Sequence, residues 1–406
     1  MKLIVRITER NPFAWLAHIV MAIVTYAYFT TTSLPLITYM MLGSVAIYVL
    51  SDESWQRLGG NGYIVYSAMQ IAYVYTVSAL GTVQTSMARS IIYQMLVCLC
   101  YFVYARSQKK IVDLVLFYVA VAVSILCARI LVDDSLASML QNVDRVGQYY
   151  TYENNNRNTI GIILGMGVMY MMHLGCTKRK IWFLPMIIAV VLSLLTGSRK
   201  AILIIAAGGV LYTYLYAKYC MRKKAKGVLV FFFVILLVIT LIYACYNHPA
   251  LYNILGHRID GFIAMLTGDG GQEASAVERA SMISKAFEMF MEKPLLGWGI
   301  EGFARYSGFG VYSHNNYMET LVSFGIFGFF LMYGGKIMLL MLQAQAMKRS
   351  LSIQRSALCV VIFVLMVTAL IIDFAAVTMN GVVSNLPFAL SAAILFTNMD
   401  MENERL

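Results

Sequence analysis

Long apolar runs recur along the whole chain and are separated by short polar stretches. Their length is close to the roughly 20 residues that a helix needs to cross the hydrocarbon core of a bilayer. They are continuous rather than alternating, which excludes a transmembrane β-barrel. Only 13% of the residues are charged, against about 25% in soluble domains. We therefore predict an all-α polytopic membrane protein with about twelve transmembrane helices, at 13–30, 35–50, 62–80, 88–105, 111–132, 159–175, 181–196, 201–217, 227–246, 317–340, 356–376 and 383–398.

Lysine and arginine gather in alternate loops between these runs, as in Lys178-Arg179-Lys180 and Arg222-Lys223-Lys224. Cytoplasmic loops of membrane proteins carry an excess of such residues. We therefore expect both chain termini on the cytoplasmic side. The net charge of +11 follows from the same bias and does not require a nucleic-acid partner.

Two of the segments on the opposite, external side are long: 133–158, and 247–316 between the ninth and tenth runs. We treat residues 1–406 as a single integral membrane domain from which these loops project. Within the second loop, Glu278–Glu292 has the pattern of an amphipathic helix, which would lie on the membrane surface or cap a cavity. Long loops tend to carry function, so 247–316 is the predicted catalytic loop. The apolar face of its helix comprises Met282, Ile283, Ala286, Phe287 and Phe290.

The long polar loop meets the next apolar run at Ser313-His314-Asn315-Asn316-Tyr317. A neutral imidazole at a membrane boundary can take a proton from a hydroxyl group on the aqueous side. The alternative interpretation is that His314 and Asn315 only cap the first turn of a helix.

Two arginines are predicted on the same external side as His314. Arg199 lies in the short turn Gly197-Ser198-Arg199, and Arg279 begins the amphipathic helix. The planar guanidinium group suits binding of phosphate or diphosphate. Alternatively, Arg199 is an interfacial side chain with its charge in water, and Arg279 is a solvated charge paired with a neighbouring glutamate.

These motifs, taken in order, resemble the membrane O-antigen ligase and polymerase superfamily. The resemblance comprises the Gly-Ser-Arg turn, a large external loop, an arginine before an apolar helix, Pro294-Leu295-Leu296-Gly297-Trp298-Gly299, and Ser-His-Asn-Asn with Gly325 eleven residues after His314. It covers roughly residues 150 to 335. The glycines after Arg199, Gly208 and Gly209, come slightly earlier than an analogous spacing in some polymerases.

The resemblance implies a membrane glycosyltransferase that assembles surface polysaccharide, as O-antigen or capsule, from oligosaccharides carried on undecaprenyl diphosphate. We expect a polymerase in a bacterial plasma (inner) membrane with its catalytic loop external or periplasmic. Expected partners are the carrier-linked oligosaccharide, an acceptor glycan, the bilayer, and a flippase and chain-length regulator, without nucleic acid. The resemblance assigns catalysis to His314, Arg279 and Arg199, and substrate binding to Arg157, Asn158, Tyr312, Asn315, Asn316 and Tyr317.

We expect no cofactor and no metal. The first external loop, 31–34, carries no acidic residue that would bind a divalent ion. The adjacent pair Asp133 and Asp134, in another loop, is the best candidate against this expectation. The 7 cysteines nearly all lie in apolar runs without metal-ligand spacing.

Three other functions remain open. A ligase of the same fold would transfer the finished glycan to lipid A core or another acceptor. A flippase has many spans but usually lacks so long an external loop. An ion-coupled transporter would carry several ionisable residues at mid-membrane, where only Asp373 is clear. Three roles are open for this carboxylate. It pairs with an arginine near the outer face, it transfers protons, or it only lies close to the membrane interface.

Overall fold

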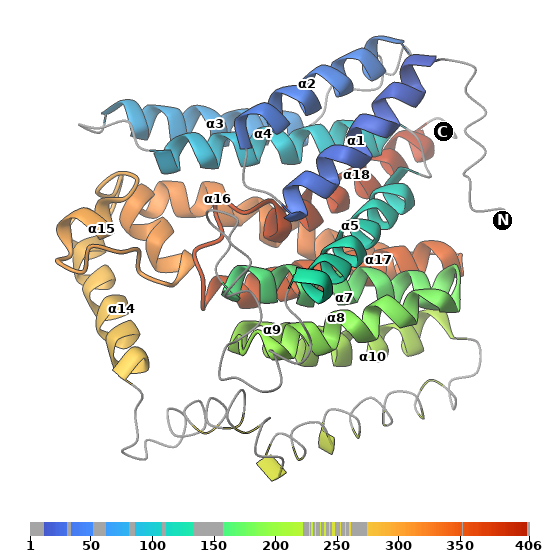
Figure 1. Ribbon diagram of the computed structural model, residues 1–406. Coiled ribbons are helices and arrows are strands. Elements are labelled where there is room, and N and C mark those ends of the chain that lie inside the picture. The colour runs from blue at the N-terminus through green and yellow to red at the C-terminus, as the bar shows by residue number, and fades with distance from the viewer. Residues whose placement is uncertain are drawn as a thin grey trace.

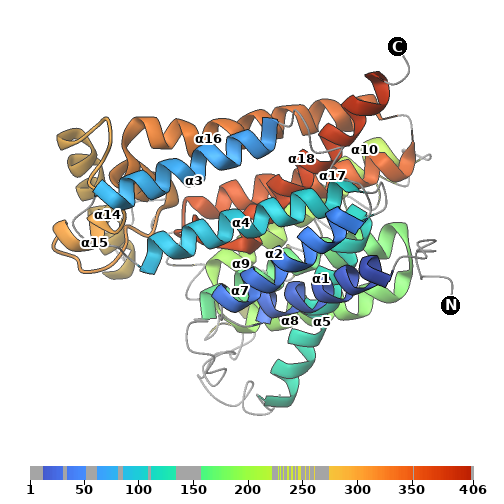
Figure 2. The same cartoon turned by 90° about the horizontal axis from the view of Figure 1, so that it is seen from above.

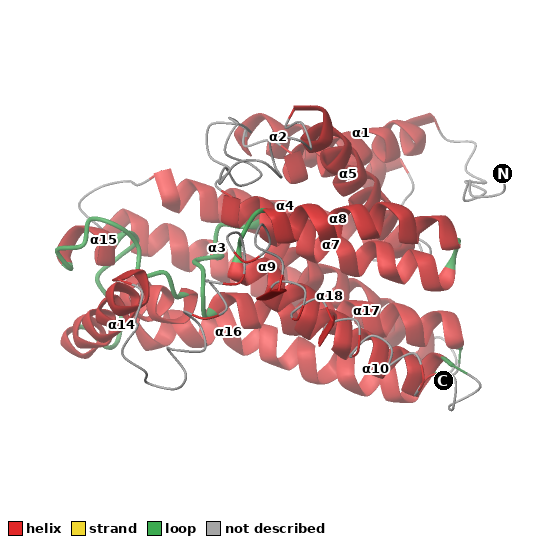
Figure 3. Cartoon of the chain, turned by 60° about the horizontal axis from the view of Figure 1, so that its bottom comes forward, coloured by secondary structure: helices red, strands yellow, loops and turns green. Residues whose placement is uncertain are grey.

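The computed structural model describes residues 12–30, 34–51, 62–80, 86–107, 111–133, 157–221, 274–350 and 352–403, with scattered positions between 227 and 260. Within these residues the regular elements are helices, and no strand is present (Figure 3). This confirms the predicted all-α class. Most of the predicted loop 133–158, most of the ninth run and the first part of the loop 247–316 lie outside the described residues.

The helices begin and end close to the limits of the apolar runs, because polar residues flank each run. The first half of the chain forms α1 (Pro12–Thr30), α2 (Leu34–Ser51), α3 (Gly62–Leu80), α4 (Ser86–Ser107), α5 (Ile111–Asp133), α7 (Arg157–Thr177), η2 (Lys180–Trp182) and α8 (Phe183–Leu195). The second half forms α9 (Arg199–Leu203), the π-helical turn η3 (Ile204–Gly208), α10 (Gly209–Cys220), α14 (Ala274–Glu292), α15 (Gly302–Tyr306), α16 (Asn316–Arg349), α17 (Ile353–Asp373) and α18 (Val382–Asn403).

Six helices among the described residues are long and apolar enough to cross a membrane: Ser86–Arg106, Val112–Val132, Asn158–Thr177, Arg199–Cys220, Asn316–Arg349 and Ile353–Asp373. Four shorter apolar helices accompany them, at Trp15–Phe29, Pro35–Tyr48, Lys180–Leu195 and Val382–Phe396. The chain is therefore a multi-pass membrane protein. The total of about twelve spans stays a prediction.

Helices α7 and α17 lie at the centre of the bundle. In their apolar windows 78% and 72% of the residues are buried, against 28% in α16. Helix α7 packs against α5, α8 and α17, and α17 packs in turn against α10, α16 and α18. The apolar side chains of α16 that face outward, such as Phe327 and Phe330, suit contact with lipid.

The polar helices α14 and α15 lie together at one end of the bundle, next to α16 (Figure 1). The start of α1 and the end of α18 lie at the opposite end, as the perpendicular view also shows (Figure 2). Helices α14 and α15, and with them the predicted catalytic residue Arg279, are thus separated from both terminal helix ends by the length of the bundle.

Helix α16 bends back on itself at Gly325, whose backbone has φ 65° and ψ −169°. In a straight helix, Asn316 and Tyr333 would lie about 25 Å apart along the axis, since each residue rises 1.5 Å. The structure instead places the amide nitrogen Nδ2 of Asn316 2.7 Å from the hydroxyl oxygen of Tyr333. Residues 316–324 therefore pack against the later turns of α16. The predicted span 317–340 is divided at Gly325 into a short helical segment and a long one.

Candidate functional site

The bend in α16 is held by the segment Pro294–Gly299, which follows α14. The backbone N–H of Trp298 donates to the carbonyl oxygen of Val322 at 2.7 Å, and that of Gly299 donates to Ser323 at 3.1 Å. In return, the N–H of Ile326 donates to the carbonyl oxygen of Pro294 at 2.8 Å. A break in a helix leaves such backbone groups without their helical partners. The Pro-Leu-Leu-Gly-Trp-Gly motif supplies the missing partners.

Two glycines make this close approach possible. A Cβ atom on Gly325 would lie 2.2 Å from the carbonyl oxygen of Leu295, and one on Gly297 would lie 2.5 Å from that of Val322. Both residues also have positive φ, 65° and 74°, which glycine adopts without the steric cost that other residues incur. Gly297 of the glycine motif and Gly325, eleven residues after His314, therefore belong to the same close contact between two backbone segments.

The same segment fixes α14 on α16. The indole N–H of Trp298 donates to the carbonyl oxygen of Met289 at 2.7 Å, near the end of α14. Met282, Ala286 and Met289 are buried against Val322 of α16. The predicted apolar face of α14 is right for Met282 and Ala286, whereas Phe287 is 52% exposed.

His314 lies in a tightly held turn just before α16. Its φ of 57° is uncommon for a residue with a side chain and indicates a strained position. The turn is fixed on both sides of His314. The backbone N–H of Ser313 donates to Oε2 of Glu319 at 2.8 Å, and the side chain of Asn315 accepts from the N–H groups of Tyr317 and Met318 at 3.0 and 3.1 Å. Asn315 is thus the residue that caps α16, and the side chain of His314 is not needed for this capping.

The imidazole of His314 is half-buried, and its ring centroid lies 4.6 Å from that of Tyr312. Burial, followed by the positive charges of Arg279 and Lys200, lowers the pKa of His314 to about 4. The ring is therefore neutral near pH 7 and able to accept a proton. The charges of Lys200 on α9 and Arg279 on α14 therefore both act on the turn before α16.

Lys200 is the residue of this site that the sequence analysis missed. Arg199 and Lys200 both lie at the start of α9 and are half-buried, and the charge of Lys200 acts on His314. Its position directly after Arg199 was the only available signal. Arg199 remains in the same short turn, within one residue of Lys200.

The start of α7 also lies against this turn. A Cβ atom on Gly161 would lie 2.9 Å from Cβ of Ser198, so α7 and the turn approach closely. The predicted substrate residues Arg157 and Asn158 form the first turn of α7, and Asn158 is exposed. The side chain of Arg157 lies outside the described residues.

The other predicted substrate residues differ in accessibility. Tyr312 is 40% exposed beside His314 and is available to a ligand. Asn315 and Asn316 are buried, and the hydroxyl group of Tyr317 donates to the carbonyl oxygen of Leu370 at 2.8 Å. The polar atoms of these three residues bond within the protein. Their assignment to substrate contact stays a prediction.

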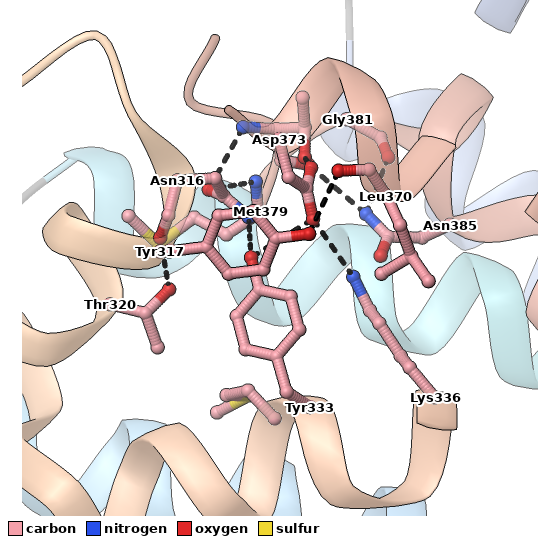
Figure 4. A network of polar contacts seen from close by, with 12 residues as sticks. Asn316, Tyr317, Thr320, Tyr333, Lys336, Leu370, Asp373, Met379, Gly381 and Asn385 are labelled. Carbon is pink, nitrogen blue, oxygen red and sulfur yellow. Dashed lines mark hydrogen bonds and ion pairs between the residues drawn. The ribbon is translucent and has the colours of Figure 1, made fainter. Parts of the chain in front are cut away.

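Asp373 is buried in a polar network beside the bend of α16 (Figure 4). Its carboxylate accepts hydrogen bonds from the hydroxyl groups of Tyr333, at 2.9 Å, and Thr378. Lys336 lies 4.0 Å from Oδ2. The predicted pairing of this carboxylate therefore occurs, but with a lysine of α16 instead of an arginine. Periodicity could not reveal this partner, because it depends on how α16 packs on α17.

A cavity of about 60 Å³ lies next to this network, between α3, α4, α16 and α18. A space of this size holds a few water molecules, at about 10–15 Å³ each, and is too small for a sugar residue. Its polar lining includes Tyr66, Gln70, Gln94, Asn316, Tyr333, Lys336 and Asn385.

Within the described part of the chain, no group of three or more histidine, cysteine, aspartate or glutamate side chains lies close enough together to hold a metal ion. The side chains of Asp133 and Asp134 lie outside the described residues.

Residues 184–333 match a protein-family model described as O-antigen ligase. The matched segment runs from α8 into α16 and contains Arg199, Lys200, Arg279, His314 and Gly325. The match confirms the resemblance to the O-antigen ligase and polymerase superfamily that the motifs indicate. The search of curated proteins returned no match to the chain.

Proposed function

We propose that this chain, a multi-pass membrane protein of the O-antigen ligase and polymerase superfamily, joins oligosaccharide repeat units carried on undecaprenyl diphosphate. The observation that carries this proposal is one half-buried imidazole, kept neutral by burial and by the charges of two cationic side chains. His314 comes from the turn before α16, Arg279 from α14 and Lys200 from α9. A proton acceptor beside positive charge suits transfer of a sugar from a diphosphate leaving group to a hydroxyl group.

The reaction forms one bond and breaks another. The acceptor hydroxyl oxygen bonds to the anomeric carbon of the donor sugar, and its proton passes to His314. The bond from that carbon to the diphosphate oxygen breaks, and the lipid diphosphate departs with the electron pair. A positioned base contributes roughly 10²–10⁴-fold to such a rate. Arg279, Lys200 and Arg199 stabilise the growing negative charge, for which preorganised charges contribute several kcal/mol.

The proposed orientation puts α14, α15 and His314 at the external face and both termini in the cytoplasm. The separation of these elements at opposite ends of the bundle supports this orientation (Figure 1). It agrees with the bias of basic residues toward the loops on the terminal side. The external carrier-linked glycan then reaches the site from the membrane, and Tyr312 offers an exposed ring for sugar stacking. We propose a flippase and a chain-length regulator as further partners.

The second candidate is a ligase that moves the finished glycan from undecaprenyl diphosphate to lipid A core or another acceptor. The description of the matching family model favours this reading. The two enzymes share donor chemistry and differ in the acceptor.

A size profile of the lipid-linked and surface glycans, in cells with and without this gene, separates the two. Loss of a polymerase leaves single repeat units on the carrier and no ladder of longer chains. Loss of a ligase leaves long chains on the carrier that never reach their anchor. A normal ladder with normal attachment in the deletion strain would contradict both proposals. Complementation with His314→Asn is the matched control for catalysis by this site.

A further inference from the structure

Asn316 connects three parts of the membrane domain through its side-chain amide (Figure 4). Its Oδ1 accepts hydrogen bonds from the backbone N–H groups of Thr378 and Met379, at 3.0 and 3.1 Å, in the turn between α17 and α18. Its Nδ2 donates to the hydroxyl oxygen of Tyr333 at 2.7 Å. The residue directly follows the turn that contains His314 and Asn315.

The direction of these hydrogen bonds follows from the chemistry of the groups. A backbone N–H can only donate, so the amide oxygen of Asn316 must face Thr378 and Met379. Its nitrogen then donates to Tyr333, whose own proton is left for Asp373, at 2.9 Å. The chain of donors ends on a carboxylate, which is the strongest type of acceptor available to it. The amide of Asn316 is thus fixed in one orientation.

This series of hydrogen bonds joins the two sides of the bend in α16. Asn316 opens the short segment before Gly325, and Tyr333 lies on the long segment after it. The ring of Tyr317, beside Asn316, stacks on the ring of Tyr333 at 4.7 Å between centroids. The later part of α16 and the end of α17 therefore hold the start of α16 in place. The turn that contains His314 directly precedes this start.

We propose that Asn316, Tyr333 and Asp373 form a polar clasp that positions His314 beside Arg279 and Lys200. The three residues act through the backbone of the His314 turn and are positioning residues. The use of His314 as a base rests on the proposed function, but its placement by the clasp is a separate claim that can be tested without substrate. Without the Tyr333 hydroxyl group, Nδ2 of Asn316 loses its acceptor, and the first turn of α16 is held less firmly.

Titration of His314 by nuclear magnetic resonance in the full chain, reconstituted in lipid nanodiscs, tests this placement. The charged groups facing His314 are Arg279 on α14 and Lys200 on α9, with Arg199 next to Lys200. The signal of His314 among the 5 histidines is identified by its loss in His314→Asn. Tyr333→Phe keeps the ring and removes only the hydroxyl group. We expect the pKa of His314 to rise toward its ordinary value by about one unit or more in this variant.

Tyr66→Phe is the matched control. Tyr66 lines the same cavity, and its hydroxyl group donates to the carbonyl oxygen of Leu331 on α16 at 2.7 Å. The hydrogen bonds of its hydroxyl group are formed with Leu331, Met332 and Gln70, so we expect the pKa of His314 to stay unchanged. An unchanged pKa in Tyr333→Phe, or an equal change in both variants, would overturn the proposal.

Asn316→Ala breaks the same hydrogen bond from the other side and replaces Tyr333→Phe if that variant does not fold. The effects of the two substitutions on the pKa should add incompletely in the double variant, because both remove the hydrogen bond between Asn316 and Tyr333. With a carrier-linked substrate, we expect kcat to fall about ten- to a hundredfold with little change in KM. If Asn316→Ala raises KM and leaves the pKa of His314 unchanged, Asn316 contacts substrate and the clasp is wrong. Full activity of His314→Asn would instead refute the proposed function, while the titration still decides on the clasp.

Discussion

Gly325 lies so close to Leu295 that a Cβ atom on the glycine would be 2.2 Å from the carbonyl oxygen of Leu295. This contact joins the segment that follows α14 to the bend of α16. Two motifs 30 residues apart in the chain are thereby parts of one structural unit.

Replacing Gly325 by alanine should destabilise this unit strongly. Its positive φ alone costs a residue with a side chain about 1–2 kcal/mol, and the clash with Leu295 adds to that cost. Gly334→Ala, on the same helix with open space around its Cβ position, is the control and should be neutral or slightly stabilising. Thermal unfolding of both purified variants in detergent measures the difference. Equal stability of the two variants would show that the bend tolerates a side chain.

His314→Asn should remove activity while leaving the protein in the membrane. Asparagine tolerates positive φ, so this variant keeps the strained turn and loses the proton acceptor. We expect a loss of roughly 10²–10⁴-fold, equal to that of His314→Ala. Transfer of labelled glycan in isolated membranes measures it, with protein amount checked by immunoblot. If His314→Asn is active and His314→Ala is not, the histidine serves the turn and not the chemistry.

Activity should depend on pH through His314. Because its pKa is lowered to about 4, the imidazole stays neutral, and the rate stays constant, as the pH falls from 7 toward 5. Lys200→Met removes one of the cations that lower this pKa, so the acid limb of the pH–rate profile should move upward. Ile202→Met, in the same short helix, is the control. An unshifted acid limb in Lys200→Met would show that the charge of Lys200 does not act on His314.

The same shift bears on stability. The pKa of His314 is lower in the folded chain than the ordinary value of about 6.5, so the unfolded chain binds the proton first as the pH falls. The contribution of His314 to stability is therefore lost between about pH 6.5 and the folded pKa of about 4, and is constant above pH 6.5. His314→Asn should unfold with a weaker pH dependence than the parent chain in this window.

Arg279→Lys should stay impaired although it keeps the charge. One ammonium group does not reproduce the two parallel donors that a guanidinium offers to a diphosphate. Arg305→Lys is the matched control, because Arg305 lies on the nearby α15 and forms only a partly exposed ion pair with Glu301 at 3.3 Å. Rates of transfer for the two variants should differ by about tenfold or more. Near-normal transfer by Arg279→Lys would argue against bidentate binding there.

The sequence alone determined the class of fold and indicated the residues of the candidate site. Runs of apolar residues require helices in lipid, because no water is present to satisfy backbone groups. The amphipathic pattern of Glu278–Glu292 corresponds to α14 (Ala274–Glu292). The order of the Arg279, Pro294–Gly299 and His314 motifs indicated a resemblance that the family model over residues 184–333 supports. These signals are local, so a single sequence displays them.

The tertiary structure decided which side chains meet. The action of the Lys200 charge on His314, and the pairing of Lys336 with Asp373, depend on the rotation and packing of helices, which periodicity does not fix. The sequence also did not predict the bend at Gly325, because a glycine within an apolar run is compatible with a continuous helix. The bend depends on contacts with Leu295 and Pro294, which come from a distant segment. Hydrogen bonds and charges act over a few ångströms in space, whatever the separation along the chain. The convergence of residues 200, 279 and 314 is therefore a property of the packed bundle.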